Sequence, residues 1–131
     1  MNVVDYVTVY YEVLRGQTVP GEVDGKFIVL ANDAERFAVF APSAMCVFHA
    51  QIVARFLSLN GVHGSLNTKG DRFAFHDSSW SIEGGGHWER DDDGLLRIFG
   101  ESEVYGGIEL EVLAGELDAD HALGAERVRP C

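Results

Sequence analysis

Two short apolar segments that lie close together in the sequence constrain the fold more than any other feature. Residues 26–30 (KFIVL) and 36–40 (RFAVF) are rich in β-branched and aromatic side chains, which favour strands. Residues 32–35 between them supply a tight connection. The two segments therefore predict a β-hairpin.

A helix is predicted directly after this hairpin. Pro42 and Ser43 form a helix-start signal in which Ser43 is the expected N-cap residue. The helix should run to about Leu59 and end at Asn60-Gly61, because glycine readily adopts the conformation that terminates a helix.

The rest of the chain repeats this order less clearly. A strand that contains three glycines precedes the apolar segment 95–100, and residues 107–118 combine strand-like alternation with helical spacing of leucines. We favour a helix over 107–118, which makes two hairpin-then-helix units. They predict a single α+β domain over residues 1–131, an α/β sandwich with one mostly antiparallel or mixed sheet and two helices packed on it. The other expected elements are strands over 3–14, 72–76, 79–90 and 126–129, loops over 16–24 and 61–71 with a turn at Asp24-Gly25, and a hairpin turn over 91–94.

Charge and cysteine content exclude several classes of protein. The 131 residues include 10 Lys and Arg but 21 Asp and Glu, a formal net charge of −11. This balance argues against nucleic-acid or anionic-membrane binding, because Lys and Arg supply most of that affinity. Two cysteines cannot build a disulfide framework, the N-terminus lacks the basic region of a signal peptide, and no apolar run approaches the ~18 residues of a membrane helix. We expect a soluble, cytoplasmic protein.

His49 is the most informative single residue. On a helix it lies in the apolar stripe, within about 40° of Met45, Val53 and Phe56. One interpretation is a core histidine that satisfies one hydrogen bond. The other is a histidine that lines a cleft at the edge of the sheet, where the positive end of the helix dipole keeps the ring neutral. A neutral imidazole can act as a general base or a nucleophile near physiological pH.

Two glycine-rich segments are candidates for binding an anion. Residues 84–86 (GGG) indicate either a tolerated β-bulge or the close approach of another group, and their N–H groups could form an anion-binding nest. The loop 100–107 (GESEVYGG) carries Ser102, and backbone amides beside a hydroxyl suit a phosphate oxygen. Glu101 and Glu103 would repel an anion if they pointed inward, and the alternative is an ordinary capped loop.

The remaining histidines give no sign of a metal site. His63, His76, His87 and His121 lack the spacing of metal ligands, so we expect neither a metal nor a cofactor. An enzyme of another class could instead pair His49 with a carboxylate as general acid and base. The carboxylates considered for that pair are Glu83, Glu89 and Glu101.

Four segments together resemble the Janus/Ocnus family, the family of the protein histidine phosphatases, also called phosphohistidine phosphatases. They follow the family's order and approximate spacing through residues 25–106. The resemblance implies a single domain with a six-stranded sheet and helices on its two faces. It also implies a metal-independent hydrolase that cleaves the phosphoramidate bond of phosphohistidine. The segments are GKFIVL (25–30), FHA (48–50), GGG (84–86) and IFGESEVYG (98–106).

The resemblance further implies a role for each matching residue. The catalytic histidine of the family corresponds to His49. Its strand lysine and loop serine, which hold phosphoryl oxygens, correspond to Lys26 and Ser102. The substrate would be a phosphorylated protein or a small phosphoramidate. The predicted substrate-binding residues are Lys26, Ser102 and Val104, the last through its backbone N–H, together with Gly86 and His87 of the triple-glycine segment.

The chain also departs from the family pattern. The arginine that typically follows the triple glycine is His87 here, a second family arginine has no counterpart in 40–42, and Glu101 and Glu103 flank the phosphate-binding serine. We expect a protonated His87 to replace the missing arginine, which would give a pH optimum below neutrality. The same departures favour an alternative, a non-catalytic member that binds a neutral or basic ligand or peptide.

Overall fold

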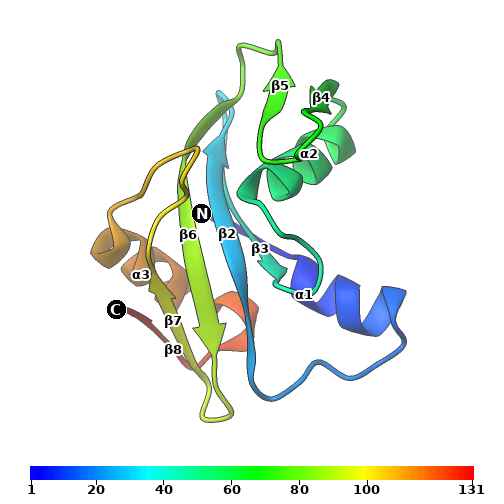
Figure 1. The fold of residues 1–131 in the computed structure, drawn as a ribbon. Helices are drawn as coiled ribbons and strands as arrows, with labels where there is room; N and C mark the ends of the chain where they lie inside the picture. Colours follow the sequence, from blue (N-terminus) through cyan, green and yellow to red (C-terminus); the bar gives the residue numbers. More distant parts are fainter.

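The computed structural model describes residues 1–131 and contains a six-stranded sheet in the order β1-β3-β2-β6-β7-β8. The outer pairs β1–β3 and β7–β8 are parallel and the inner pairs are antiparallel, so the sheet is mixed. It curls into a half-barrel (Figure 1). Its strands are β1 (Asn2–Asp5), β2 (Val23–Ala31), β3 (Arg36–Pro42), β6 (Ser81–Arg90), β7 (Leu95–Phe99) and β8 (Arg127–Pro130); β4 (Gly64–Leu66) and β5 (Phe73–Phe75) form a separate small hairpin.

Helices cover both faces of the sheet. In Figure 1, α2 and the β4–β5 hairpin lie on one side of the sheet and α3 lies on the other. The predicted α+β architecture with one mixed sheet is confirmed, and so is the helix expected within 107–118, but a third helix is present near the N-terminus. None of the helices combines the length and apolar character that a membrane crossing requires. The helical segments are α1 (Tyr6–Thr8), which continues as the π-helix η1 (Val9–Leu14), α2 (His49–Leu59), α3 (Leu110–Ala119) and the 3₁₀-helix η2 (Ala122–Gly124).

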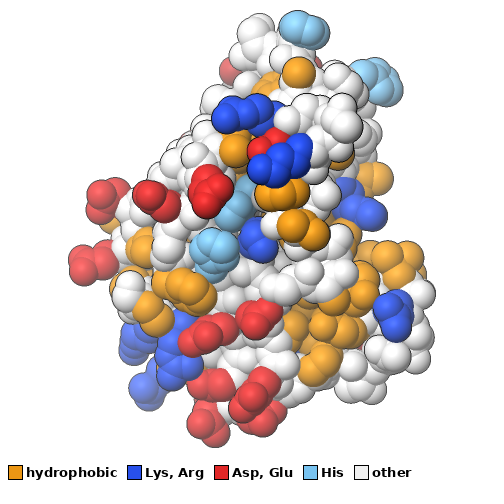
Figure 2. All heavy atoms as spheres, in the orientation of Figure 1, with side chains coloured by type: hydrophobic (Ala, Val, Ile, Leu, Met, Phe, Trp, Pro, Cys, Tyr) orange, Lys and Arg blue, Asp and Glu red, His pale blue; other side chains and the backbone are white.

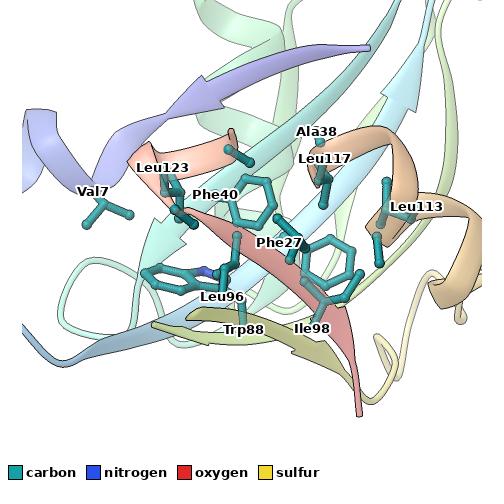
Figure 3. Close-up of a cluster of buried hydrophobic side chains, with 14 of the residues drawn as sticks. Val7, Phe27, Ala38, Phe40, Trp88, Leu96, Ile98, Leu113, Leu117 and Leu123 are labelled. Carbon is teal, nitrogen blue, oxygen red and sulfur yellow. The ribbon is translucent and has the colours of Figure 1, made fainter. Parts of the chain in front are cut away.

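The predicted hairpin of β2 and β3 forms the centre of the molecule and divides two cores. Alternate residues of a strand point to opposite faces. Ile28 and Leu30 therefore pack with α2, whereas Phe27 and Val29 face the side covered by α3. Figure 3 shows the core on the α3 side, where the labelled side chains converge from the sheet and the helices; its largest members are Trp88, Phe27, Phe40, Leu96, Ile98, Leu113 and Leu117.

The predicted helix start at Ser43 is wrong, because α2 begins at His49. Pro42 is still part of β3, and the backbone N–H of Ser43 donates to the carbonyl oxygen of Asp24 at 2.9 Å. The Ser43 hydroxyl donates to the Asp24 carboxylate at 2.7 Å instead of capping a helix. Pairing with β2 thus extends β3 through Pro42, and α2 begins only after the turn that follows.

Gln51 supplies the cap that Ser43 was expected to provide. Its side-chain Oε1 accepts hydrogen bonds from the backbone N–H groups of Val47 at 2.7 Å and Phe48 at 3.2 Å. His49 is consequently the first residue of α2 rather than a residue in its middle. The predicted end of the helix at Leu59 is confirmed.

The predicted strand over 3–14 is correct only as far as Asp5. The Asp5 carboxylate accepts from the backbone N–H of Thr8 at 2.9 Å and from the Thr8 hydroxyl at 2.7 Å, which starts a helical turn. Tyr6 and Val7 are buried in that turn. Capping and burial therefore override the strand preference of these residues.

The turn expected at Asp24-Gly25 is also wrong, since both residues lie inside β2. A Cβ atom on Gly25 would lie 1.8 Å from the carbonyl oxygen of Ala41 in β3. This glycine marks the close approach of two strands rather than a reversal of the chain.

The other expected elements are confirmed with small shifts in their ends. The strand predicted over 79–90 begins at Ser81, and the turn over 91–94 joins it to β7. The loop predicted over 61–71 contains the short strand β4, which was not expected.

Candidate functional site

The side chains singled out from the sequence meet at one pocket of about 220 Å³. The pocket lies between β2, β6, the first residues of α2 and the loop after β7. Figure 2 shows histidine and basic side chains together in a hollow of the surface, with acidic side chains around it. Five of the six predicted site residues line it, and the sixth, Gly86, lies directly behind His49. The five are Lys26, His49, His87, Ser102 and Val104.

His49 is held at one ring nitrogen and open at the other. The residue is 7% exposed, and its Nε2 lies 2.7 Å from the carbonyl oxygen of Gly86. A carbonyl can only accept a hydrogen bond, so Nε2 carries the proton and donates it. In the neutral ring Nδ1 then holds the lone pair, and no protein group is bonded to it.

Burial keeps the His49 ring neutral. Desolvation lowers the pKa of His49 below its ordinary value of 6.5, and the nearby His87 and Lys26 lower it further. The hydrogen bond to Gly86 opposes part of this shift. The ring is therefore an unprotonated base at neutral pH, but the largest cause is burial and not the helix dipole on which the cleft interpretation relied. The ring also makes the single hydrogen bond expected of a core histidine.

The triple glycine lets other groups approach β6 closely. A Cβ on Gly85 would lie 2.5 Å from the carbonyl oxygen of Phe27 and 3.1 Å from Cδ2 of His49. A Cβ on Gly84, whose φ is +151°, would lie 2.4 Å from the carbonyl oxygen of Gly107. The register of β2 and β6 also shifts here. Both interpretations, a bulge and a close approach, are confirmed.

Lys26 and His87 are direct neighbours across β2 and β6, on the face that carries α2. No carboxylate forms an ion pair with Lys26, so its charge is available inside the pocket. The His87 ring stacks on Phe99 with 5.8 Å between ring centres. Desolvation lowers the pKa of His87, and the charge of Lys26 lowers it further. His87 is therefore uncharged at neutral pH and gains a positive charge only in acid.

The loop after β7 contributes a hydroxyl and backbone donors. Ser102 is 2% exposed, and its Oγ accepts a hydrogen bond from the backbone N–H of Tyr105 at 3.1 Å. The N–H of Ser102 is already bonded to the carbonyl oxygen of Gly85 at 3.1 Å. The N–H groups of Glu103 and Val104 have no acceptor in the protein. Such donors at a pocket wall suit an anion.

Two charged residues of the pocket were not predicted from the sequence. Lys69 and Asp71 belong to the turn of the β4–β5 hairpin, and their charged groups lie 3.8 Å apart. Lys69 lies over the ring of Phe48 at 5.8 Å. Nothing local in the sequence links this turn to α2, so only the folded structure brings these residues to the pocket.

Two other kinds of chemistry find no matching arrangement of groups here: Glu101 lines the pocket without an ion pair to a histidine, and Glu89 lines the neighbouring hollow. No group of three or more His, Cys, Asp or Glu residues that could hold a metal ion occurs in the structure. Neither His49 nor His87 forms an ion pair with a carboxylate. Glu83, one of the carboxylates considered as a partner of His49, is bound to Arg36 at 2.9 Å. The geometry therefore gives no support to a histidine–carboxylate pair.

Comparison with known proteins does not identify the chain. No protein-family model matches it, and no curated protein does so. What the pocket can do chemically follows from its own residues: a neutral imidazole, a lysine without a partner, a buried hydroxyl and free N–H groups around one small cavity.

Proposed function

We propose that the chain is a divergent member of the Janus/Ocnus family, with a phosphohistidine-phosphatase-like fold, and that it hydrolyses phosphoramidate bonds. The substrate would be a phosphohistidine in a protein or a small phosphoramidate. The observation that carries this proposal is the unpartnered Nδ1 of a neutral, buried His49 in the same pocket as Lys26. The resemblance of the four sequence segments supports it, because their residues are the ones that meet at this pocket.

The phosphoryl group would lie between Lys26 and the loop after β7. Lys26 supplies a positive charge, and the hydroxyl of Ser102 and the N–H of Val104 supply hydrogen-bond donors for the equatorial oxygens. Ser102 is buried and held before the substrate arrives, and Lys26 is anchored by its backbone in a central strand. Pre-arranged donors of this kind stabilise the charge that builds up on a transferring phosphoryl group.

His49 would act through Nδ1 in one of two ways. As a base it takes a proton from water while the water oxygen bonds to phosphorus and the P–N bond breaks. As a nucleophile it bonds to phosphorus itself, and water then releases phosphate from the ring in a second step. In both routes the electron pair of the P–N bond stays on the leaving nitrogen, which is protonated from solvent. The products are inorganic phosphate and the free amine or imidazole.

The absence of the two family arginines lowers the expected affinity for the phosphoryl group. Each charged hydrogen bond that is missing costs roughly 1.5–3 kcal/mol of binding. A neutral His87 does not restore this charge at pH 7, because burial and Lys26 lower its pKa. The hypothesis that a protonated His87 replaces an arginine therefore predicts activity that increases only in acid.

A hydrolysis assay with a matched control tests the proposal. His49→Gln keeps an amide that can donate to the Gly86 carbonyl but removes the base, so we expect phosphate release from phosphoramidate and from a phosphohistidine peptide to fall at least ~100-fold. His63→Gln, at an exposed loop histidine, should match the parent. Equal rates for His49→Gln and the parent would refute the proposal.

The alternative function is a binding module for a neutral or basic ligand. Glu101 and Glu103 favour it, because they are exposed at the pocket rim and neither has a basic partner. Absence of hydrolysis by the parent between about pH 5 and 8 would support this alternative. Micromolar binding of inorganic phosphate that depends on Ser102 would contradict it.

A further inference from the structure

The sheet face that carries the pocket continues past it as a row of charged residues. Lys26 and His87 lie side by side, and Phe99 of β7 lies beside His87. Two residues further along the same strands lies a second row on the same face. It consists of Asp24, Glu89 and Arg97. Neighbouring rows on one face of a sheet are about 7 Å apart.

This second row lies in a hollow of about 500 Å³. Glu22 and Asp91 also line that hollow, and Tyr11 of η1 forms part of its wall. In Figure 2 acidic side chains lie next to the hollow that holds the histidines and spread beyond it. The pocket and the hollow are therefore parts of one open face of the sheet.

The carboxylates of this face exceed its cations. Glu22 and Asp24 form no ion pair, and Glu89 and Asp91 share Arg97, at 3.8 Å and 3.1 Å. Arg90 is directed away, with its guanidinium donating to the carbonyl oxygen of Leu123 at 2.7 Å. On the other side of the pocket, Glu101 and Glu103 are also unpaired. A basic group of a ligand that lies beside the pocket would therefore meet carboxylates that have no basic partner in the protein.

We propose that this face binds an extended, basic polypeptide segment whose modified side chain enters the pocket. In an extended chain, side chains two residues apart lie on one side and about 7 Å apart. A residue in the pocket would therefore place the side chain two positions away over Asp24 and Glu89, where Lys or Arg fits the charge. The face that runs from His49 to Asp24 and Glu89 is the proposed peptide track, and the buried residue His49, whose Nδ1 has no protein partner, marks the end where the phosphoryl group would lie.

That the residue in the pocket carries a phosphoryl group rests on the proposed function. The preference of the neighbouring face for a basic segment does not. Carboxylates attract a basic peptide whether or not it is hydrolysed. The position of the basic residue is the specific part of the proposal, because a residue only one position away points to the opposite side of an extended chain.

Three phosphohistidine peptides test this inference in the parent. One has a lysine two positions from the phosphohistidine, one has it one position away, and one has no lysine. We expect the peptide with Lys two positions away to have the lowest KM. In the double variant Asp24→Asn with Glu89→Gln, its KM should rise about tenfold, the scale of two partly screened ion pairs. The KM of phosphoramidate, a small anion, should fall in the same variant, because two negative charges near Lys26 are gone. Damage to the fold would raise both values.

Binding of the unphosphorylated peptides, followed by fluorescence anisotropy, separates this inference from the proposed function. Glu111→Gln, on the exposed side of α3, is the control and should leave the preference unchanged. If the parent hydrolyses nothing but still binds the peptide with Lys two positions away most tightly, the track stands and the phosphatase proposal fails. Equal affinity for all three peptides, or a preference that survives in the double variant, would overturn the track.

Discussion

At the scale of single residues, the ring of His49 connects the core to the pocket. Its Nε2 is fixed by the Gly86 carbonyl at 2.7 Å, and its Nδ1 has no protein partner. Burial lowers the pKa of the ring, so the chain buries it as a neutral base. A buried neutral histidine has a cost in acid, because the unfolded chain takes up the proton more readily than the folded one.

This linkage predicts a pH-dependent difference in stability between the parent and His49→Gln. Because the pKa of His49 is lowered in the folded state, the contribution of the histidine is fully present above its unfolded pKa of about 6.5 and is lost as the pH falls below that value. Glutamine does not titrate. The stability of the parent relative to the variant should therefore be constant above about pH 7 and fall towards pH 5. Urea denaturation of both proteins measures it, and a difference that does not change with pH would contradict the neutral ring.

The sequence could place His49 near the apolar stripe of a helix but could not place it at the helix start. Ser43 is a typical N-cap residue, yet its N–H and hydroxyl both bond to Asp24. The choice between a helix cap and a sheet bond depends on a partner 19 residues away, which no local pattern contains.

At the scale of elements, the triple glycine of β6 decides whether the pocket can form. Gly85 lies where a Cβ would meet the carbonyl oxygen of Phe27 at 2.5 Å and the His49 ring at 3.1 Å. The backbone oxygen belongs to a central strand that cannot move away. The glycines therefore allow β2 to pair closely with β6 within the sheet while the start of α2 packs against the face of β6.

We expect Gly85→Ala to destabilise the protein by about 1–3 kcal/mol, the usual cost of forcing an extra group into a packed site. It should also displace the His49 ring and lower hydrolysis. Gly115→Ala in α3 is the matched control: nothing lies within 4 Å of its added Cβ, and alanine favours a helix by up to ~1 kcal/mol. Thermal and urea denaturation of both variants measure the effects. A Gly85→Ala variant as stable as the parent would show that the close approach is not required.

At the scale of the whole molecule, local sequence patterns predict the strands of the sheet better than they predict its curvature and the loops that pack around the pocket. The hairpin, the six-stranded mixed sheet and the helix within 107–118 follow from short-range periodicity and the family resemblance. The curl of the sheet and the arrival of Lys69 at the pocket depend on long-range packing. Residues 3–14 illustrate the limit, because their strand-forming composition gives way to a capped helix after Asp5.

The net charge of −11 makes a prediction for the folded molecule as a whole. Like charges that crowd together on folding repel one another, and salt screens this repulsion. The ion pairs of Arg36 with Glu83 and Glu116 oppose the trend, but they are few beside the unpaired carboxylates. Raising NaCl from about 20 mM to about 500 mM should therefore raise Tm in a thermal scan. A fall in Tm would mean that the ion pairs outweigh the repulsion.

The state of the His49 ring is the central claim, and ¹⁵N NMR of the histidine side chains tests it most directly. At about pH 7 we predict a neutral ring protonated at Nε2, with an unprotonated Nδ1 whose resonance shifts when inorganic phosphate is added. His49→Gln assigns the signals, and the exposed His63 should not respond to phosphate. A charged ring, a ring protonated at Nδ1, or a His49 signal that ignores saturating phosphate would contradict the account.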